Sequence, residues 1–255
     1  MHSPIRRDDG STPDAQDAER SGWLRIPEGR SADVAVKPAA YLPIYEQLFE
    51  ALREREFVLL ELGVWGGDSL EMWREAFPHA TIVGLDLRPP DRDDLGPRVH
   101  IVEGDQTDAE LMGRLRRQYA PGGFDVIIDD ASHIGVTSAR SLQALFNEHL
   151  RPGGTYCIED WGTGYVPDFF DGGALVSPLA VDSLDASAVP MQADRSDPIP
   201  LPSHDVGMVG LIKRLVDHAA AGTVRWAQPE LVGETLAIDS MSVWDGVVAL
   251  RKRPA

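Results

Sequence analysis

Five short apolar segments recur along the chain, and amphipathic segments separate most of them. The apolar segments are FVLLELG (57–63), TIVGLDL (81–87), RVHIVEGD (98–105), FDVIIDD (124–130) and TYCIED (155–160). Apolar runs of this length are typical of parallel strands that are covered on both faces. Residues 67–77, 108–119 and 136–150 carry the periodicity of helices. This alternation predicts a doubly wound parallel sheet.

The last part of the chain departs from this alternation. A further helix is predicted over 206–220, and residues 223–254 then give two strands around a loop with no helix between them. Two strands connected in this way pair antiparallel at one sheet edge. The predicted fold class is therefore α/β: a class I methyltransferase (Rossmann-like) doubly wound sheet of seven strands with an antiparallel C-terminal hairpin.

Polar segments flank and interrupt the predicted domain. Residues 1–35 are predicted to be an N-terminal arm that is flexible or contacts another subunit, and residues 36–255 to be the methyltransferase domain. A helix over 38–55 leads into the first strand. Residues 161–203 are rich in Gly, Pro and Asp and are interpreted as a long loop over the strand ends, where loops usually serve function.

Composition narrows the class of protein. The 255 residues carry a net charge of −17, which disfavours nucleic acid and anionic membranes as partners. No apolar stretch approaches the roughly 18 residues of a membrane span, and residues 1–22 lack the apolar core of a secretory signal. The single cysteine, Cys157, excludes an internal disulfide and falls within a predicted core strand. A cytoplasmic enzyme fits these features.

A glycine-rich turn follows the first predicted strand. Gly63, Gly66 and Gly67 allow the backbone to pass close to a ligand and to start the next helix tightly. The turn lacks the GxGxxG form typical of pyrophosphate cofactors, and Glu61 suits a cationic ligand better than a diphosphate. Alone, this turn is a weak signal.

Polar residues at the next two strand ends extend the signal. Asp86 stands where a carboxylate accepts the hydroxyl groups of a ribose, and Asp105 with Gln106 stands where polar groups contact an adenine edge. Taken one at a time, each is equally well explained as an ordinary polar strand end. Together with the turn and the hairpin, they predict a site for S-adenosylmethionine.

Carboxylates end two of the apolar runs. Asp129 and Asp130 close one strand, and Glu159 and Asp160 close the next. If these strands are neighbours, they lie about 4.8 Å apart, and the crowded carboxylates repel one another unless a cation lies between them. Oxygen ligands at an accessible rim favour a hard cation, Mg²⁺ first. His133 lies within reach of the same point.

This arrangement suits methyl transfer to a sugar hydroxyl. Such a hydroxyl has a pKa far above 7, and a divalent ion lowers it. His133 is then the candidate general base. The plainer alternatives are that His133 caps the following helix and that the carboxylates are ordinary polar strand ends.

The motifs ELGVWGGDSLEMW, GLDL, GDQTD, FDVIIDDASH and LRPGGTYCIEDWGTGY resemble the metal-dependent sugar O-methyltransferases of antibiotic pathways, of the mycinamicin and TDP-rhamnose types. The resemblance covers about residues 55–165. It implies that Asp130, Glu159 and Asp160 are metal ligands and that His133 is the base. Asp129 matches the motif and is grouped with the cofactor residues as an organiser of the backbone.

The resemblance also implies a sugar as the small-molecule substrate and assembly into a homo-oligomer. A short arm in place of the added N-terminal domain of the larger macrolide enzymes favours a nucleotide sugar. Two other functions stay open from the sequence. One is a catechol-type O-methyltransferase, and the other is a non-catalytic accessory protein with a methyltransferase fold.

Overall fold

The computed structural model describes residues 22–27, 37–166, 168–172, 207–220 and 235–255. Within these ranges the strands are β1 (Val58–Leu62), β2 (Thr81–Asp86), β3 (Val99–Glu103), β4 (Phe124–Asp129), β5 (Leu150–Glu159), β6 (Ile238–Val243) and β7 (Val247–Lys252). The α-helices are α1 (Leu42–Phe49), α2 (Asp68–Ala76), α3 (Ala109–Tyr119), α4 (Gly135–Leu145) and α5 (Gly207–Ala219). The same described ranges contain four short 3-10 helices: η2 (Ala39–Tyr41), η3 (Glu50–Leu52), η4 (Asp93–Leu95) and η5 (Trp161–Tyr165).

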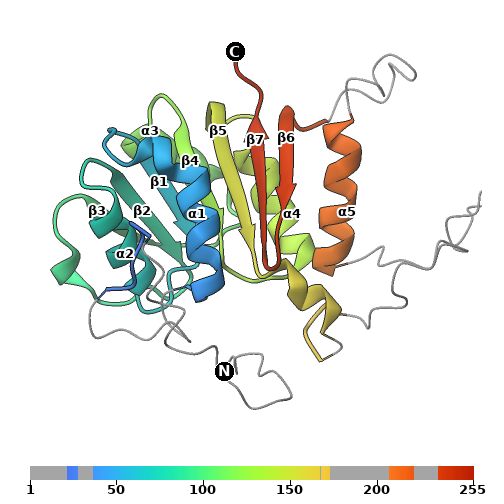
Figure 1. The fold of residues 1–255 in the computed structure, drawn as a ribbon, viewed down its shortest axis with the longest axis horizontal. Coiled ribbons are helices and arrows are strands. Elements are labelled where there is room, and N and C mark those ends of the chain that lie inside the picture. Colours follow the sequence, from blue (N-terminus) through green and yellow to red (C-terminus); the bar gives the residue numbers. More distant parts are fainter. Residues whose placement is uncertain (1–21, 28–36, 167, 173–206, 221–234) are drawn as a thin grey trace, which may run out of the picture.

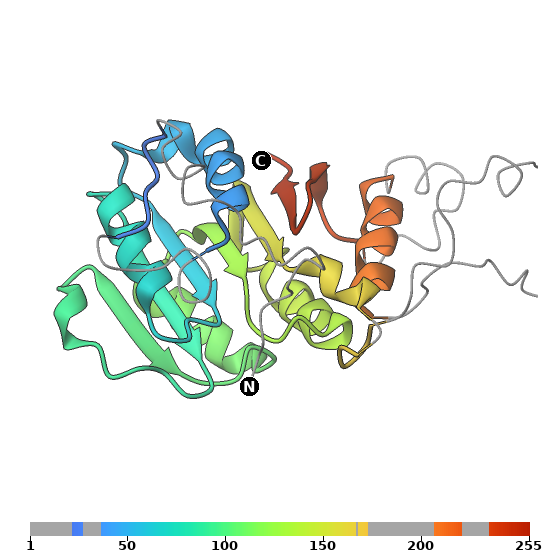
Figure 2. The same cartoon turned by 60° about the horizontal axis from the view of Figure 1, so that its bottom comes forward.

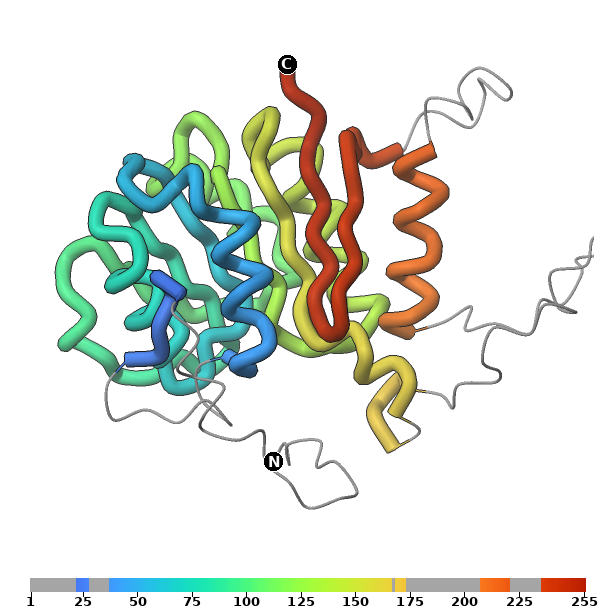
Figure 3. The backbone as a smooth tube through the Cα atoms, in the orientation of Figure 1, coloured from blue at the N-terminus to red at the C-terminus, as the bar shows by residue number. Residues whose placement is uncertain are grey.

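The seven strands form one sheet in the order β3-β2-β1-β4-β5-β7-β6 (Figure 1). Strands β1 to β5 run parallel, whereas β7 pairs antiparallel with both β5 and β6. Figure 3 shows the chain turning back between β6 and β7 beside β5. The predicted class I methyltransferase arrangement, with its C-terminal hairpin, is confirmed.

Helices cover both faces of the sheet (Figures 1 and 2). Residues of α1 and α2 form one buried cluster with alternate residues of β1, β4, β5 and β7. Residues of α3, α4 and α5 form a second buried cluster on the other face. The central strands are therefore apolar at almost every position, which is why each appears in the sequence as a continuous apolar run. Cys157 is buried in β5, as predicted.

Part of the predicted N-terminal arm packs on the domain. Leu24 is buried, and its backbone N–H donates to the Glu46 carboxylate of α1 at 2.8 Å. The Trp23 ring packs edge-on against Phe77 after α2, with the ring centroids 5.5 Å apart. The remaining residues of the arm up to 36, and most of the predicted loop 161–203, lie outside the described residues. Among the described helices, none is both long and apolar enough to cross a membrane.

Gly63 lets the turn after β1 pass directly beside the end of β4. Its φ is +82°, in the left-handed region that glycine adopts without a steric penalty. A Cβ atom here would lie 2.3 Å from the carbonyl oxygen of Asp130 and 2.5 Å from the Cα of Ala131. The position therefore has no room for a side chain.

Replacing Gly63 by alanine should destabilise the protein. The left-handed φ and the backbone clash together should lower the free energy of unfolding by about 2–4 kcal/mol. Gly122→Ala is the matched control, because a Cβ there meets nothing within 4 Å; its effect should stay within about 0.5 kcal/mol. Urea denaturation of both variants checks this, and equal midpoints would contradict it.

Candidate active site

The ends of β1, β4 and β5 bring acidic side chains from distant parts of the chain together. Parallel pairing sets Leu62 beside Asp129, and Asp129 beside Ile158. The backbone N–H of Asp130 donates to the Leu62 carbonyl at 2.9 Å, so the pairing continues one residue past β4. The carboxylates that follow these strands therefore share one rim, as the sequence predicted.

Two groups of possible metal ligands lie at this rim, each with ligand atoms within 4.8 Å of one another. The inner cluster consists of Glu61, Asp130 and Glu159, and the outer group of Asp130, His133 and Asp160. Asp130 belongs to both. The three predicted metal ligands thus meet through Asp130, with Glu159 on the inner side and Asp160 on the outer side.

A lysine that the sequence analysis did not single out lies within the inner cluster. The Nζ of Lys37 is 2.8 Å from Glu61 Oε1, 2.5 Å from Asp130 Oδ2 and 2.8 Å from Glu159 Oε1. Glu61 and Glu159 are almost fully buried, as is Lys37. The ammonium group therefore neutralises part of a charge that burial would otherwise make very costly.

Burial and mutual repulsion shift the ionisation of this cluster. Burial, with the nearby charges of Asp160 and Glu61, raises the pKa of Asp130 to about 6, although Lys37 and His133 oppose the shift. Burial and the charge of Asp130 raise the pKa of Glu159 well above its usual value. Burial opposes the charge on Lys37, yet the surrounding carboxylates hold its pKa well above the ordinary lysine value. These groups form one coupled electrostatic unit.

The outer group is the part of the rim that reaches solvent. His133 Nε2 lies 3.8 Å from Asp130 Oδ1 and 3.7 Å from Asp160 Oδ2. The Asp160 side chain is 37% exposed and that of Asp130 22% exposed. His133 is thus positioned to exchange a proton with a bound molecule while facing two carboxylates.

Backbone strain is concentrated at this rim. Among the described residues, three that are not glycine have a positive φ: Trp65 at 44°, His133 at 51° and Asp160 at 52°. Two belong to the outer group, and the third lies in the glycine turn. Such conformations cost about 1–3 kcal/mol each and are found mainly at functional sites.

Two tyrosines of the leading helical segment also donate to the rim. Tyr41 Oη donates to Asp160 Oδ1 at 2.5 Å, and Tyr45 Oη donates to Glu159 Oε1 at 2.5 Å. Both rings are buried within the cluster that packs on the sheet. The sequence places these tyrosines at helical spacing before the first strand, but it does not identify their acceptors.

Four of the predicted cofactor residues, Gly63, Gly66, Gly67 and Asp86, lie in or beside the turn after β1. Gly67 has a φ of +80° and precedes α2, whereas a Cβ at Gly66 would meet only Asp68, at 3.7 Å. Asp86, at the end of β2, accepts hydrogen bonds from the backbone N–H groups of Val64 at 2.9 Å and Trp65 at 3.1 Å. In this structure, therefore, Asp86 shapes the turn itself.

Arg92 further stabilises this turn, a role that no motif in the sequence indicates. Its guanidinium donates to the Gly66 carbonyl and to Asp68 Oδ1, both at 3.0 Å, and to Glu71 Oε2 at 3.0 Å. The turn is thus fixed to the first turn of α2.

The buried side chains of Glu61 and Gln106 form hydrogen bonds with other side chains of the protein. Glu61 Oε2 accepts from Ser69 Oγ at 2.9 Å. Gln106 Nε2 donates to Asp129 Oδ1 at 3.0 Å and to Ser141 Oγ at 2.8 Å. Asp129 also accepts from Tyr156 Oη at 3.3 Å, which fits its predicted role as an organiser.

Asp105 is exposed beside Gln106. Its Oδ1 accepts from the backbone and the hydroxyl of Thr107, both at 2.8 Å, and these bonds lower the pKa of the carboxyl. The sequence placed Asp105 at a cofactor edge, and the structure leaves its side chain at the surface of that edge.

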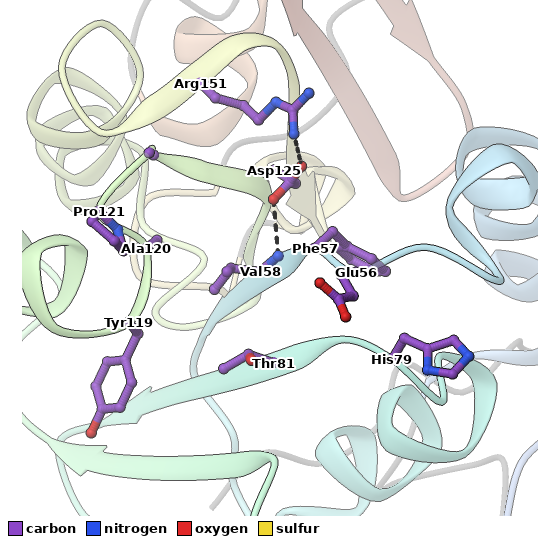
Figure 4. Close-up of a pocket in the computed structure, with 12 residues that line it drawn as sticks. Glu56, Phe57, Val58, His79, Thr81, Tyr119, Ala120, Pro121, Asp125 and Arg151 are labelled. Carbon is purple, nitrogen blue, oxygen red and sulfur yellow. Dashed lines mark hydrogen bonds and ion pairs between the residues drawn. The ribbon is translucent and has the colours of Figure 1, made fainter.

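A pocket of about 550 Å³ opens at the opposite end of the sheet (Figure 4). Phe57, Thr81 and Asp125 line it from the first residues of β1, β2 and β4 or just before them. Asp125 pairs with Arg151 and accepts from the Val58 backbone at 2.9 Å. None of the predicted site residues lies there, so we assign the candidate active site to the carboxyl-terminal rim.

Known proteins give an independent comparison. The chain is 43% identical over 137 residues to mycinamicin VI 2''-O-methyltransferase of Micromonospora griseorubida, covering 51% of this chain and 33% of that protein. It is 38% identical over 173 residues to demethylmacrocin O-methyltransferase of Streptomyces fradiae, covering 61% and 42%. The chain is similar to sugar O-methyltransferases of antibiotic pathways. The predicted resemblance is confirmed.

A solved structure supports the same relationship. The MycE methyltransferase of the mycinamycin pathway, in complex with Mg, SAH and mycinamycin VI, is 33% identical, with a TM-score of 0.64, over 84% of this chain and 49% of that one. The chain spans less than half the length of the curated relatives it matches. No protein-family model matches it. The similarity favours neither the catechol nor the accessory alternative.

Proposed function

We propose that this protein is an O-methyltransferase that uses S-adenosylmethionine and Mg²⁺ to methylate a hydroxyl of a deoxysugar, on a nucleotide sugar or a glycosylated natural product. The observation that carries the proposal is the outer group: His133 facing Asp130 and Asp160 at adjacent strand ends. This reading is supported by the 37–43% identity, over about half of this chain, to sugar O-methyltransferases.

The cofactor is proposed to lie over the turn after β1. Gly63 and Gly67 keep the backbone free of side chains at its two bends. Asp86 and Asp105 supply carboxylates at the ends of β2 and of the β3 connection, where a ribose and an adenine edge are expected. Inside the protein, the hydrogen bond between Gln106 and Asp129 supports the proposed adenine side of the site.

The carboxylates of the rim fit a hard divalent cation. They offer only oxygen ligands next to one imidazole, and Lys37 is the one lysine or arginine, within the described ranges, that forms an ion pair with Asp130 and Glu159. Asp130 and Asp160 would hold the ion, with Glu159 as the third predicted ligand. When bound, the ion supplies positive charge that makes a sugar hydroxyl more acidic.

His133 performs the proton transfer in the proposed reaction. Its Nε2 would take the proton of the sugar hydroxyl. S-adenosylmethionine would supply the methyl group to the sugar oxygen, with the electron pair of the broken C–S bond staying on sulfur. The strained backbone at His133 and Asp160 orients both side chains toward the same point. Trp65 lies in the glycine turn after β1 and is 68% exposed.

Metal binding should depend on Asp130. We expect Asp130→Asn to lose most Mg²⁺ binding in calorimetry, because this residue is common to both ligand groups, while S-adenosylhomocysteine still binds. Asp91→Asn, at an exposed position, is the control and should bind Mg²⁺ as the wild type does. Full methyl transfer by metal-free protein in EDTA would contradict a metal requirement.

The role of His133 is tested separately. We expect His133→Ala to lower the methyl-transfer rate by roughly 10²–10⁴-fold, the usual range for a positioned acid–base group. The Mg²⁺ affinity should change much less than the rate. His79→Ala, an exposed histidine at the far end of the sheet, should transfer at the wild-type rate. A near-normal rate for His133→Ala between pH 6 and 9 would assign the proton to another group.

We also propose that the protein is a homo-oligomer in which a second subunit covers the rim. The Asp160 side chain is 37% exposed at the rim, and excluding water strengthens the charge interactions that methyl transfer relies on. Light scattering of the full chain should give at least the mass of a dimer. A monomer with full activity at micromolar concentration would contradict this proposal.

A further inference from the structure

Three donors from one short segment contact the carboxylate rim. Lys37 precedes η2 by two residues, Tyr41 ends η2 and Tyr45 lies in α1. All three side chains face the carboxylate rim. We call these three residues the donor stripe.

Each member of the donor stripe contacts carboxylates of the rim. Tyr41 donates to Asp160, and Tyr45 donates to Glu159. The Lys37 ammonium contacts all three carboxylates of the inner cluster within 2.8 Å. The stripe therefore binds every acidic side chain that the outer group and the inner cluster contain.

Lys37 is the only charged member of the stripe, and its position is fixed on all sides. Glu61 Oε2 accepts a hydrogen bond from Ser69 Oγ at 2.9 Å, which fixes the side of Glu61 that faces away from Lys37. Glu159 Oε1 accepts from Tyr45 as well as Lys37. Asp130 Oδ2 accepts a hydrogen bond from Lys37, whereas Asp130 Oδ1 is the oxygen that lies nearest to His133. Lys37 thus sets the direction in which Asp130 faces the outer group.

The charge balance of the inner cluster depends on the contact between the Lys37 ammonium and its three carboxylates. Three carboxylates gather within 4.8 Å, and Glu61 and Glu159 are almost wholly removed from water. In the part of the chain that the structure describes, no arginine or second lysine forms an ion pair with any of the three. Removing the one ammonium would leave buried carboxylates with no cation.

We propose that Lys37 is a positioning residue whose ammonium group is the built-in cation of the inner cluster and competes with a divalent ion for Asp130 and Glu159. Without metal, Lys37 holds these carboxylates together and turns Asp130 toward His133. The competition rests on the proposed metal site, whereas the positioning does not.

The positioning is tested on EDTA-treated full-length protein, without metal or turnover. Lys37→Met should lower the Tm by on the order of 10 °C, because buried carboxylates lose their cation. The double variant Lys37→Met/Glu159→Gln should be more stable than Lys37→Met alone, since a neutral amide needs no ammonium. This non-additivity distinguishes a direct interaction between Lys37 and Glu159 from general destabilisation of the core.

Two results would overturn the positioning. One is a Tm of Lys37→Met within about 2 °C of the wild type. The other is a double variant no more stable than Lys37→Met, which would mean that the two residues are not coupled. If Lys37→Met alone is too unstable to purify, recovery of folded protein in the double variant gives the same answer.

The competition is tested by adding Mg²⁺ and measuring the Tm again. Lys37→Met should gain more Tm from Mg²⁺ than the wild type, because the divalent ion takes over the vacated oxygens. Lys252→Met is the matched control: Lys252 is also buried, but it donates to the carbonyls of Asn147 at 2.5 Å and Leu150 at 2.6 Å. It should lose stability yet respond to Mg²⁺ as the wild type does.

The outcomes separate the two proposals. An equal Mg²⁺ response in Lys37→Met and the wild type would overturn the competition. No Mg²⁺ response in any variant would overturn the metal site of the proposed function and the competition with it, while the metal-free comparison still decides whether Lys37 positions the cluster.

Discussion

Mutual repulsion among carboxylates at the ends of β1, β4 and β5 is the constraint on which the site depends. A parallel sheet brings these strand ends together regardless of their distance in the sequence, and here each of the three supplies acidic side chains. Burial makes their charge more costly than it would be in water. The Lys37 ammonium and the hydroxyls of Tyr41 and Tyr45 offset that cost from one side. On the other side of Asp130 lies His133, and the divalent ion is proposed to bind there.

The fold supplies the precision that this arrangement requires. Gly63 allows the β1 turn and the end of β4 to come into backbone contact. Asp86 and Arg92 then fix the same turn to the end of β2 and to α2. The rim is therefore built on strand ends and short turns, which hold side chains more exactly than long loops do. The positive φ of His133, 51°, carries a conformational cost that the surrounding structure has to offset.

The sequence predicted the strands, their alternation with helices and the acidic rim because each has a local pattern. Five apolar runs gave the parallel strands, and the motif from Asp129 to His133 gave the rim. It did not predict Lys37, whose partners lie far away in the sequence and whose flanking residues form no recognisable motif. Nor did it predict that Gln106 donates to Asp129 and Ser141, because a buried network depends on tertiary packing.

The central claim, that the rim is a divalent-metal site serving methyl transfer to a sugar, is tested most directly by anomalous diffraction. Crystals grown with S-adenosylhomocysteine and Mn²⁺ in place of Mg²⁺ would locate the ion without any assumption about its ligands. The account predicts an anomalous peak bound by carboxylate oxygens of Asp130 and Asp160, with S-adenosylhomocysteine over the turn at Gly63. A peak elsewhere, or none at a Mn²⁺ concentration that supports turnover, would contradict it.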